Sequence, residues 1–263
     1  MLVLEKISKV FNPGSPDEKM ALDAVDLEVE QGDFITIIGS NGAGKTTLLN
    51  IITGTVFPDS GRVSICRRDV TGFKEHARAC YLARVFQNPS LGTAADMTIE
   101  ENLCLAELRG QRRRLTWGIT GNRRARYREV LKALDLGLEN RLEEKVGLLS
   151  GGQRQSLSLL MTTLVPPSVL LLDEHTAALD PKTAEKVMNL TEMMVGRRQL
   201  TTLMVTHNMN QAIKHGNRMI MLHQGRIQLD LSGEDKSNLT VSQVIDKFGR
   251  ALKDETLFSR EEK

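Results

Sequence analysis

The nine residues from Gly39 to Thr47, with the sequence Gly-Ser-Asn-Gly-Ala-Gly-Lys-Thr-Thr, constrain the fold of this chain more than any other segment. One apolar run, residues 34–38, precedes them and another, residues 48–52, follows, so we expect a strand, a glycine loop and a helix in that order. Glycines let the backbone turn so that successive N–H groups point inward, and the new helix adds the positive end of its dipole. The segment therefore predicts a binding site for a polyphosphate.

Two side chains at the end of this loop have the chemistry that a bound nucleotide needs. Lys45 is expected to reach the β- and γ-phosphates, and the Thr46 hydroxyl is placed to ligate a magnesium ion shared with them. The alternative is a glycine turn that binds nothing, which the flanking strand and helix disfavour. The predicted nucleotide-binding residues of the loop are Gly39, Ser40, Asn41, Gly42, Ala43, Gly44, Lys45, Thr46 and Thr47.

Composition bounds the class of protein. The chain has 263 residues and a formal net charge of +2, which favours neither a generally acidic nor a generally basic partner. Apolar runs all fall short of the roughly 18 to 20 residues that span a bilayer, and the first residues do not form a signal peptide, so we expect a cytosolic protein. Cys66, Cys80 and Cys104 are widely spaced without a metal-binding pattern and are interpreted as small buried hydrophobic residues.

The N-terminal part of the chain has the alternating apolar pattern of an antiparallel β layer. Residues 1–36 have alternating apolar positions, such as Leu2, Leu4 and Leu27, and the Asn-Pro-Gly-Ser-Pro-Asp sequence of residues 12–17 predicts a hairpin tip among them. Phe11 stands just before this tip. It is a candidate to stack on an adenine ring, and packing in the core is the equal alternative.

Residues from Thr98 to about Leu164 have helical periodicity, which predicts a helical insert in an α/β core. The insert contains a run of arginines with no Asp or Glu between the first and the last. A solvated face is the favoured interpretation, a contact with lipid headgroups or an acidic partner is the sharper one, and a nucleic-acid groove is disfavoured because few aromatic residues accompany the run. The arginines are Arg109, Arg112, Arg113, Arg114, Arg123, Arg124, Arg126 and Arg128.

Three later segments have the chemistry of phosphate handling. Ser150, followed by two glycines, predicts a capped helix start with free N–H groups, a second anion site. The apolar strand of residues 169–172 ends in Asp173 and Glu174, which predicts a magnesium-side carboxylate and a base for a water that attacks the γ-phosphate. A further strand, residues 201–205, delivers His207, which is expected to hydrogen-bond the γ-phosphate or that water.

With these segments in place, the chain resembles the nucleotide-binding subunit of the ATP-binding cassette (ABC) transporters over about residues 2–231. The resemblance implies an α/β fold: a P-loop NTPase core with an antiparallel β layer and an inserted α-helical subdomain at about residues 88–165. Residues 232–263 lie beyond the resemblance and are expected to form a short helical tail. It also implies an ATPase that uses ATP and Mg²⁺. The implied site residues are Phe11 on the adenine, Lys45, Gln87, Glu174 and His207 in catalysis, Thr46, Gln87 and Asp173 at the metal, and the marker pentapeptide of Leu149, Ser150, Gly151, Gly152 and Gln153.

The family further implies a head-to-tail homodimer that closes on two ATP molecules, with the marker pentapeptide acting across the dimer and Asp180 in a loop at the dimer contact. It implies transmembrane permease subunits and a substrate-binding protein as partners, no nucleic acid, and a peripheral place on the inner face of the membrane. This sequence departs from the common pattern at His175, where the family usually has Pro, and at Ala177.

The direction of transport is open between two groups of relatives. The segment from Asp173 to Lys182 resembles cassettes of binding-protein-dependent uptake systems, some of them for aromatic amino acids. The long tip of residues 12–20 resembles the lipoprotein-release and macrolide-export group. We favour import of a small solute such as an amino acid, keep export or lipoprotein release as the alternative, and give a non-transport cassette ATPase less weight.

Overall fold

The computed structural model describes residues 1–111, 117–247 and 249. The chain divides into two compact units. The first unit combines residues 1–74 with the described residues from 201 onward, and the second unit spans residues 75–200. In the sequence, the second unit is thus inserted between the two parts of the first unit. The phosphate loop belongs to the part before the insertion.

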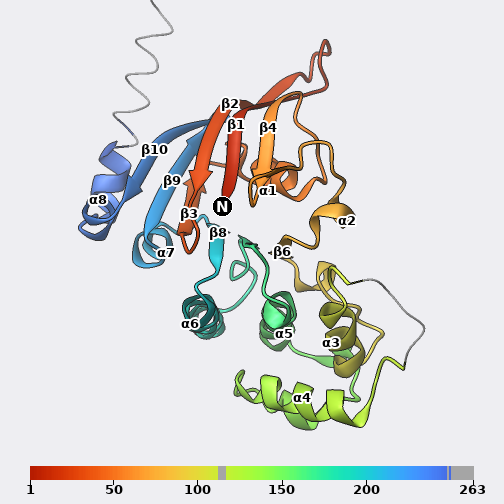
Figure 1. Ribbon diagram of the computed structural model, residues 1–263. Helices are drawn as coiled ribbons and strands as arrows, with labels where there is room; N and C mark the ends of the chain where they lie inside the picture. The colour runs from red at the N-terminus through yellow and green to blue at the C-terminus, as the bar shows by residue number, and fades with distance from the viewer. Residues whose placement is uncertain (112–116, 248, 250–263) are drawn as a thin grey trace, which may run out of the picture. The chain divides into compact units, whose positions relative to one another are not determined.

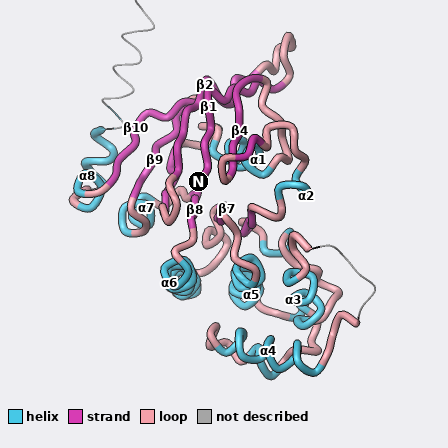
Figure 2. Tube along the Cα trace, in the orientation of Figure 1, coloured by secondary structure: helices cyan, strands magenta, loops and turns pink. Residues whose placement is uncertain are grey.

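An antiparallel sheet in the first unit has the strand order β2-β1-β4-β5. Strand β1 (Leu2–Phe11) pairs with β2 (Lys19–Val29) on one side and with β4 (Ser60–Ile65) on the other, and β5 (Arg68–Asp69) follows β4. Leu2 and Leu4 are buried, as the alternating pattern predicts. The antiparallel β layer and its hairpin tip are therefore confirmed (Figure 2).

The strands of the first unit's other sheet lie in the order β10-β9-β3-β8. Strand β3 (Phe34–Gly39) runs parallel to β8 (Thr201–Val205) and to β9 (Arg218–His223), and β10 (Arg226–Ser232) pairs antiparallel with β9. Residues 34–38 of β3 and all of β8 are buried, which fits sequences in which every residue is apolar or threonine. Gln224 and Gly225 join β9 to β10 with φ values of 45° and 79°, which suit a tight hairpin turn.

Three labelled helices belong to the first unit: α1 (Lys45–Thr53), α7 (Met209–Lys214) and α8 (Glu234–Ser237), and residues 241–247 are also helical. A cluster of buried residues joins this C-terminal part to the sheet: Ile38, Ala212, Met219, Met221 and Val244. The last described turns of the chain therefore share a core with β3 and β9.

The second unit is mainly helical. Its helices are α2 (Glu75–Arg78), α3 (Ile99–Glu107), α4 (Gly121–Lys132), α5 (Gly151–Leu164) and α6 (Pro181–Arg198), with short 3₁₀ turns at Pro89–Leu91, Leu138–Asn140 and Val146–Leu148. Strands β6 (Leu82–Val85) and β7 (Val169–Asp173) pair in parallel. Helix α5 packs against both α3 and α6 (Figure 1), and Leu103, Tyr127 and Leu157 are buried in the core beneath them.

Three arginines of the run, Arg123, Arg124 and Arg126, form ion pairs in this unit. Arg124 forms a bidentate pair with Glu100 at 2.7 Å, Arg126 pairs with Glu107, and Arg123 lies 3.3 Å from Glu107. Glu100 and Glu107 precede the run in the sequence, and Glu143, 3.2 Å from Arg124, follows it, so the acidic partners lie outside the run itself. Arg112, Arg113 and Arg114 lie outside the described residues.

Two further observations concern composition. Cys104 is buried as predicted, but Cys66 and Cys80 are exposed, so the prediction was wrong for these two. Cys66 lies in the turn between β4 and β5, and Cys80 follows α2, which are both surface positions. In the part of the chain that the structure describes, every helix is too short or too polar to cross a membrane.

Candidate functional site

The phosphate loop is clamped between two strands of the first unit. Gly42 and Gly44 have φ values of 81° and 103°, in the left-handed region that glycine adopts readily. A Cβ atom on Gly44 would lie 2.4 Å from the carbonyl oxygen of Ala21 in β2, and one on Gly39 would lie 2.3 Å from that of Leu222 in β9. Because both neighbours are backbone atoms, these two positions require glycine.

Lys45 is the first residue of α1, and its side chain turns back over the loop. Its ammonium group donates to the carbonyl oxygens of Gly39 at 2.7 Å and of Ser40 at 3.0 Å, and the residue is 7% exposed. Thr46 is exposed and Thr47 is half-buried. A helix start, a glycine loop and a buried ammonium group together form a strong anion-binding arrangement.

Lys19, the first residue of β2, lies beside this loop, and the sequence did not predict this position. The ammonium nitrogen of Lys19 lies 3.1 Å from the position that a Cβ atom on Gly42 would take. Lys19 also faces Phe11 across the hairpin. Phe11 is 37% exposed at the end of β1, with the Lys9 ammonium group 5.6 Å from its ring centroid. The hairpin thus connects the proposed adenine-stacking residue to the phosphate loop.

His207 stands two residues after the end of β8 and is exposed. The neighbouring Thr206 hydroxyl accepts a hydrogen bond from the N–H group of Asn208 at 3.1 Å, and Asn208 caps α7. The segment that carries His207 is therefore fixed at both ends, by a buried strand and by a helix cap.

Strand β7 of the second unit ends at Asp173, and Glu174 follows it directly. The Asp173 carboxylate binds the Arg84 guanidinium at 2.5 Å, and the two side chains are 14% and 12% exposed. Glu174 has a φ of 44°, a conformation that is uncommon for a residue with a side chain. The turn is closed by a hydrogen bond of 2.9 Å from the Ala177 N–H group to the Glu174 carbonyl oxygen. The sequence did not predict that Arg84 pairs with Asp173. The signal that could have indicated it was a charged residue within an otherwise apolar strand.

The marker pentapeptide forms the start of α5. Ser150 caps the helix, and its hydroxyl accepts from the Gln153 N–H group at 3.3 Å while the Gln153 side chain accepts from the Ser150 N–H group at 3.1 Å. This is a capping box, which satisfies two of the free N–H groups at the helix start. Leu149 is buried in the core of the unit.

Asp180 lies beside the marker pentapeptide. It caps α6 by accepting from the Thr183 N–H group at 3.1 Å, and this interaction with Thr183 lowers the pKa of its carboxyl group. A Cβ atom on Gly152 would lie 2.3 Å from Cγ2 of Thr183. The structure therefore brings the marker pentapeptide and the start of α6 into contact, and Gly152 permits this close approach.

Gln87 is exposed and follows β6 by two residues. Phe86, the residue before Gln87, is bound to α5, because the Gln155 side chain donates to the Phe86 carbonyl oxygen at 3.1 Å. The predicted site residues are thus divided between the units. The first unit contains Phe11, Gly39–Thr47 and His207, and the second contains Gln87, Leu149–Gln153, Asp173, Glu174 and Asp180.

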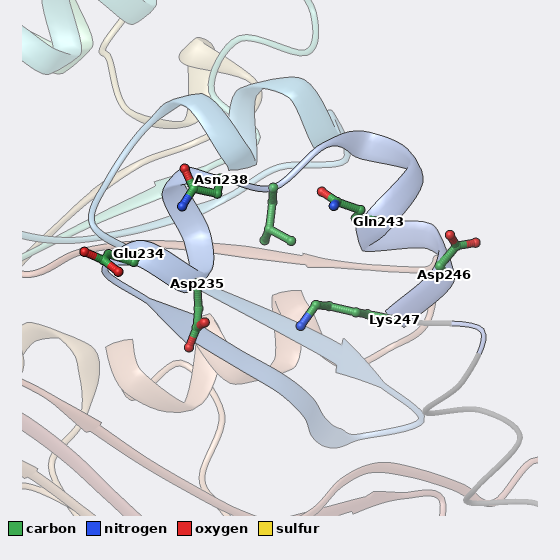
Figure 3. Close-up of a pocket in the computed structure, with 7 residues that line it drawn as sticks. Glu234, Asp235, Asn238, Gln243, Asp246 and Lys247 are labelled. Carbon is green, nitrogen blue, oxygen red and sulfur yellow. The ribbon is translucent and has the colours of Figure 1, made fainter.

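A pocket with a volume of 420 Å³ lies in the C-terminal part of the first unit (Figure 3). Polar and charged side chains dominate its lining, which comprises Glu234, Asp235, Asn238, Leu239, Gln243, Asp246 and Lys247. None of the predicted site residues lines it. Among the described residues, no group of three His, Cys, Asp or Glu side chains is arranged to hold a metal ion.

Comparison with known proteins identifies the family of the chain. The family model described as "ABC transporter" matches residues 22–177. The Tyrosine transport ATP-binding protein of Clostridioides difficile (strain R20291) is 44% identical over 96% of this chain and 100% of its own length. The lipoprotein-releasing system ATP-binding protein LolD of Chromohalobacter salexigens is 34% identical over 88% of this chain and 94% of its own length.

Solved structures show the same fold. An ATP-binding cassette solved as a dimer in a post-hydrolysis state, bound to ADP and Pi, superposes with a TM-score of 0.75 at 31% identity, and the match covers 88% of this chain and 98% of that chain. The P-loop NTPase fold is therefore confirmed. The chain belongs to the ABC transporter family, as an ATP-binding subunit that hydrolyses ATP.

Proposed function

We propose that this chain is the energy-coupling subunit of a multi-subunit importer that takes up a small solute such as an amino acid. The observation that supports this most is the likeness to the tyrosine transport ATP-binding protein, which extends over the full length of that relative. The proposal places the chain at the inner face of the membrane, bound to transmembrane permease subunits, with a substrate-binding protein in the same complex.

Each predicted site residue has a role in this proposal. The loop from Gly39 to Thr47 binds the phosphates through its N–H groups, with the Lys45 ammonium group as the main positive charge. Phe11 stacks on the adenine, and Lys19, beside the loop, adds a second cation near the phosphates. Glu174 accepts a proton from the attacking water, and His207 donates a hydrogen bond to the γ-phosphate.

The proposed metal is Mg²⁺, held by the Thr46 hydroxyl, the Gln87 amide oxygen and the Asp173 carboxylate. These are oxygen donors, which fit Mg²⁺ better than they fit a softer transition metal. When bound there, Mg²⁺ would supply positive charge to offset the negative charge that develops on the phosphates. The residues of the chain then have to position the phosphates and the water.

The marker pentapeptide is proposed to act on the ATP of a second copy of the chain. Its capped helix start is an anion site separate in sequence from the phosphate loop, so a head-to-tail homodimer gives each ATP both sites. Asp180, which caps α6 next to Gly152, would lie at the same dimer contact.

The test is the oligomeric state of the Glu174→Gln variant, measured by light scattering with and without Mg²⁺ and ATP. Loss of the carboxylate blocks hydrolysis and should trap the closed form, so we expect ATP to convert monomer to dimer. A second substitution, Ser150→Arg, places a bulky cation at the marker and should abolish this dimer. A Glu174→Gln protein that binds ATP and stays monomeric would contradict the shared site.

Export or lipoprotein release is the second candidate, supported by the likeness to LolD and by the long tip of the hairpin that β1 and β2 form. Uptake of radiolabelled tyrosine and other amino acids by cells that express the complex, with Glu174→Gln as the inactive control, distinguishes the two. ATP-dependent accumulation supports import. Accumulation that does not depend on Glu174 argues against it.

A further inference from the structure

Arg84 is the one charged residue of β6, and it faces Asp173 of the neighbouring strand β7. The Nη2 atom of Arg84 lies 2.5 Å from Oδ2 of Asp173. With side chains only 12% and 14% exposed, the pair is little screened by water. A surface arginine would give a weak contact, but this one is a charge-assisted hydrogen bond in a largely buried position.

The same guanidinium group lies over the ring of Phe86, 4.9 Å from its centroid. Phe86 precedes Gln87, and its carbonyl oxygen is held by Gln155, which is 1% exposed in α5. Arg84 therefore fixes the distance between two segments of the second unit: the carboxylate that ends β7 and the segment that leads to Gln87.

We propose that Arg84 is a positioning residue for Asp173, and that its positive charge raises the concentration of Mg²⁺ that the protein requires. The inference rests on the proposed function, in which Asp173 lies on the metal side of the nucleotide. A carboxylate that is already engaged by a guanidinium offers less negative charge to a divalent cation, and the two cations repel each other at short range. The stack on Phe86 keeps the guanidinium in place beside Asp173.

The test replaces Arg84 with neutral residues and titrates Mg²⁺ at a fixed nucleotide concentration. Arg84→Met removes the charge and keeps the apolar stem, and Arg84→Gln keeps a hydrogen-bond donor for Asp173, which protects folding if the Met variant is unstable. The midpoint of the titration is measured by phosphate release with ATP and, independently of turnover, by the rise in Tm with a non-hydrolysable ATP analogue.

We expect the midpoint to fall about threefold to tenfold in both variants, since the competing charge is gone. Arg218→Met is the matched control, because Arg218 also pairs with an aspartate on a neighbouring strand, Asp230, but in the first unit, whereas Asp173 belongs to the second. It should keep the wild-type midpoint. A midpoint in the folded Arg84 variants that equals or exceeds that of the wild type overturns the proposal.

Failure of the inference and failure of the proposed function give different results. If Asp173 binds the metal, Asp173→Asn should raise the midpoint of the Mg²⁺ titration. If Asp173→Asn keeps the wild-type midpoint, the metal-side role of Asp173 is wrong. If it shifts the midpoint and the Arg84 variants do not, the role of Asp173 stands and the role of Arg84 is wrong.

Discussion

The Nε2 atom of His175 lies 3.1 Å from Oγ1 of Thr191, and both side chains are buried. The Thr191 hydroxyl donates its hydrogen to the Val187 carbonyl oxygen at 2.8 Å, so it can only accept from the imidazole. His175 is therefore protonated on Nε2, and this hydrogen bond ties the residue after Glu174 to the middle of α6. The departure from the usual Pro at this position thus has a structural role.

Thr191→Val tests this contact. The substitution keeps the shape of the side chain and removes the acceptor, which leaves a buried N–H group unsatisfied, so the free energy of unfolding should fall by about 1–3 kcal/mol. Thr191→Ser keeps the hydroxyl and should lose less. Urea unfolding of the three proteins measures the difference, and equal stability of the Val variant and the wild type would show that the hydrogen bond contributes nothing net.

Gly44→Ala tests the clamp on the phosphate loop. The added methyl group meets the Ala21 carbonyl oxygen at 2.4 Å, so the loop must move, and ATP binding should weaken by at least about tenfold. Gly14→Ala is the control, since Gly14 has a φ of 75° and open space around it. It should lose about 1–2 kcal/mol of stability from the left-handed backbone alone and bind ATP as the wild type does. Isothermal titration with ATP measures both.

Glu174→Gln tests the proposed base directly. If Glu174 accepts the proton of the attacking water, steady phosphate release should fall about 10²- to 10⁴-fold, while ATP affinity stays near that of the wild type. Glu185→Gln, an exposed change on α6, is the matched control and should hydrolyse ATP normally. Wild-type turnover in the Glu174 variant would move the base to another residue.

Lys236 predicts an unusual dependence of stability on pH. Burial lowers the pKa of its ammonium group from 10.5 to about 8, and its nitrogen donates to the carbonyl oxygens of His215 and Gly216, which a neutral amine can also do. Between these two pH values the unfolded chain holds a proton that the folded chain has released, so stability rises as pH rises above about 8. At lower pH both states are protonated and the penalty of burying the charge is present in full.

Unfolding in urea at several pH values between about 7 and 9.5 measures this effect. The rise in stability should be smaller in Lys236→Met than in the wild type, because Met does not titrate. Lys214→Met, an exposed change on α7, should keep the wild-type rise. A Lys236→Met protein with the full rise would assign it to another group.

Much of this architecture followed from local patterns in the sequence. The strand before Gly39, the hairpin tip of residues 12–17 and the cap at Ser150 each depend on residues within a few positions, so each could be predicted. Arg84 and Lys19 depend on which strands become neighbours, which a single sequence does not record. The exposure of Cys66 and Cys80 and the burial of Lys236 were hidden for the same reason.

Because of the capping box at the start of α5, a substitution of Ser150 in the marker pentapeptide has more than one effect. The Ser150 oxygen stabilises its own helix by accepting from Gln153, and in the proposed dimer its hydroxyl hydrogen is offered to the phosphate of the other copy. Ser150→Ala therefore removes an intramolecular and an intermolecular interaction in one step. Ser150→Asp preserves the cap and places a negative charge where the phosphate would bind. It should therefore prevent dimer closure without destabilising the helix, two effects that Ser150→Ala produces together.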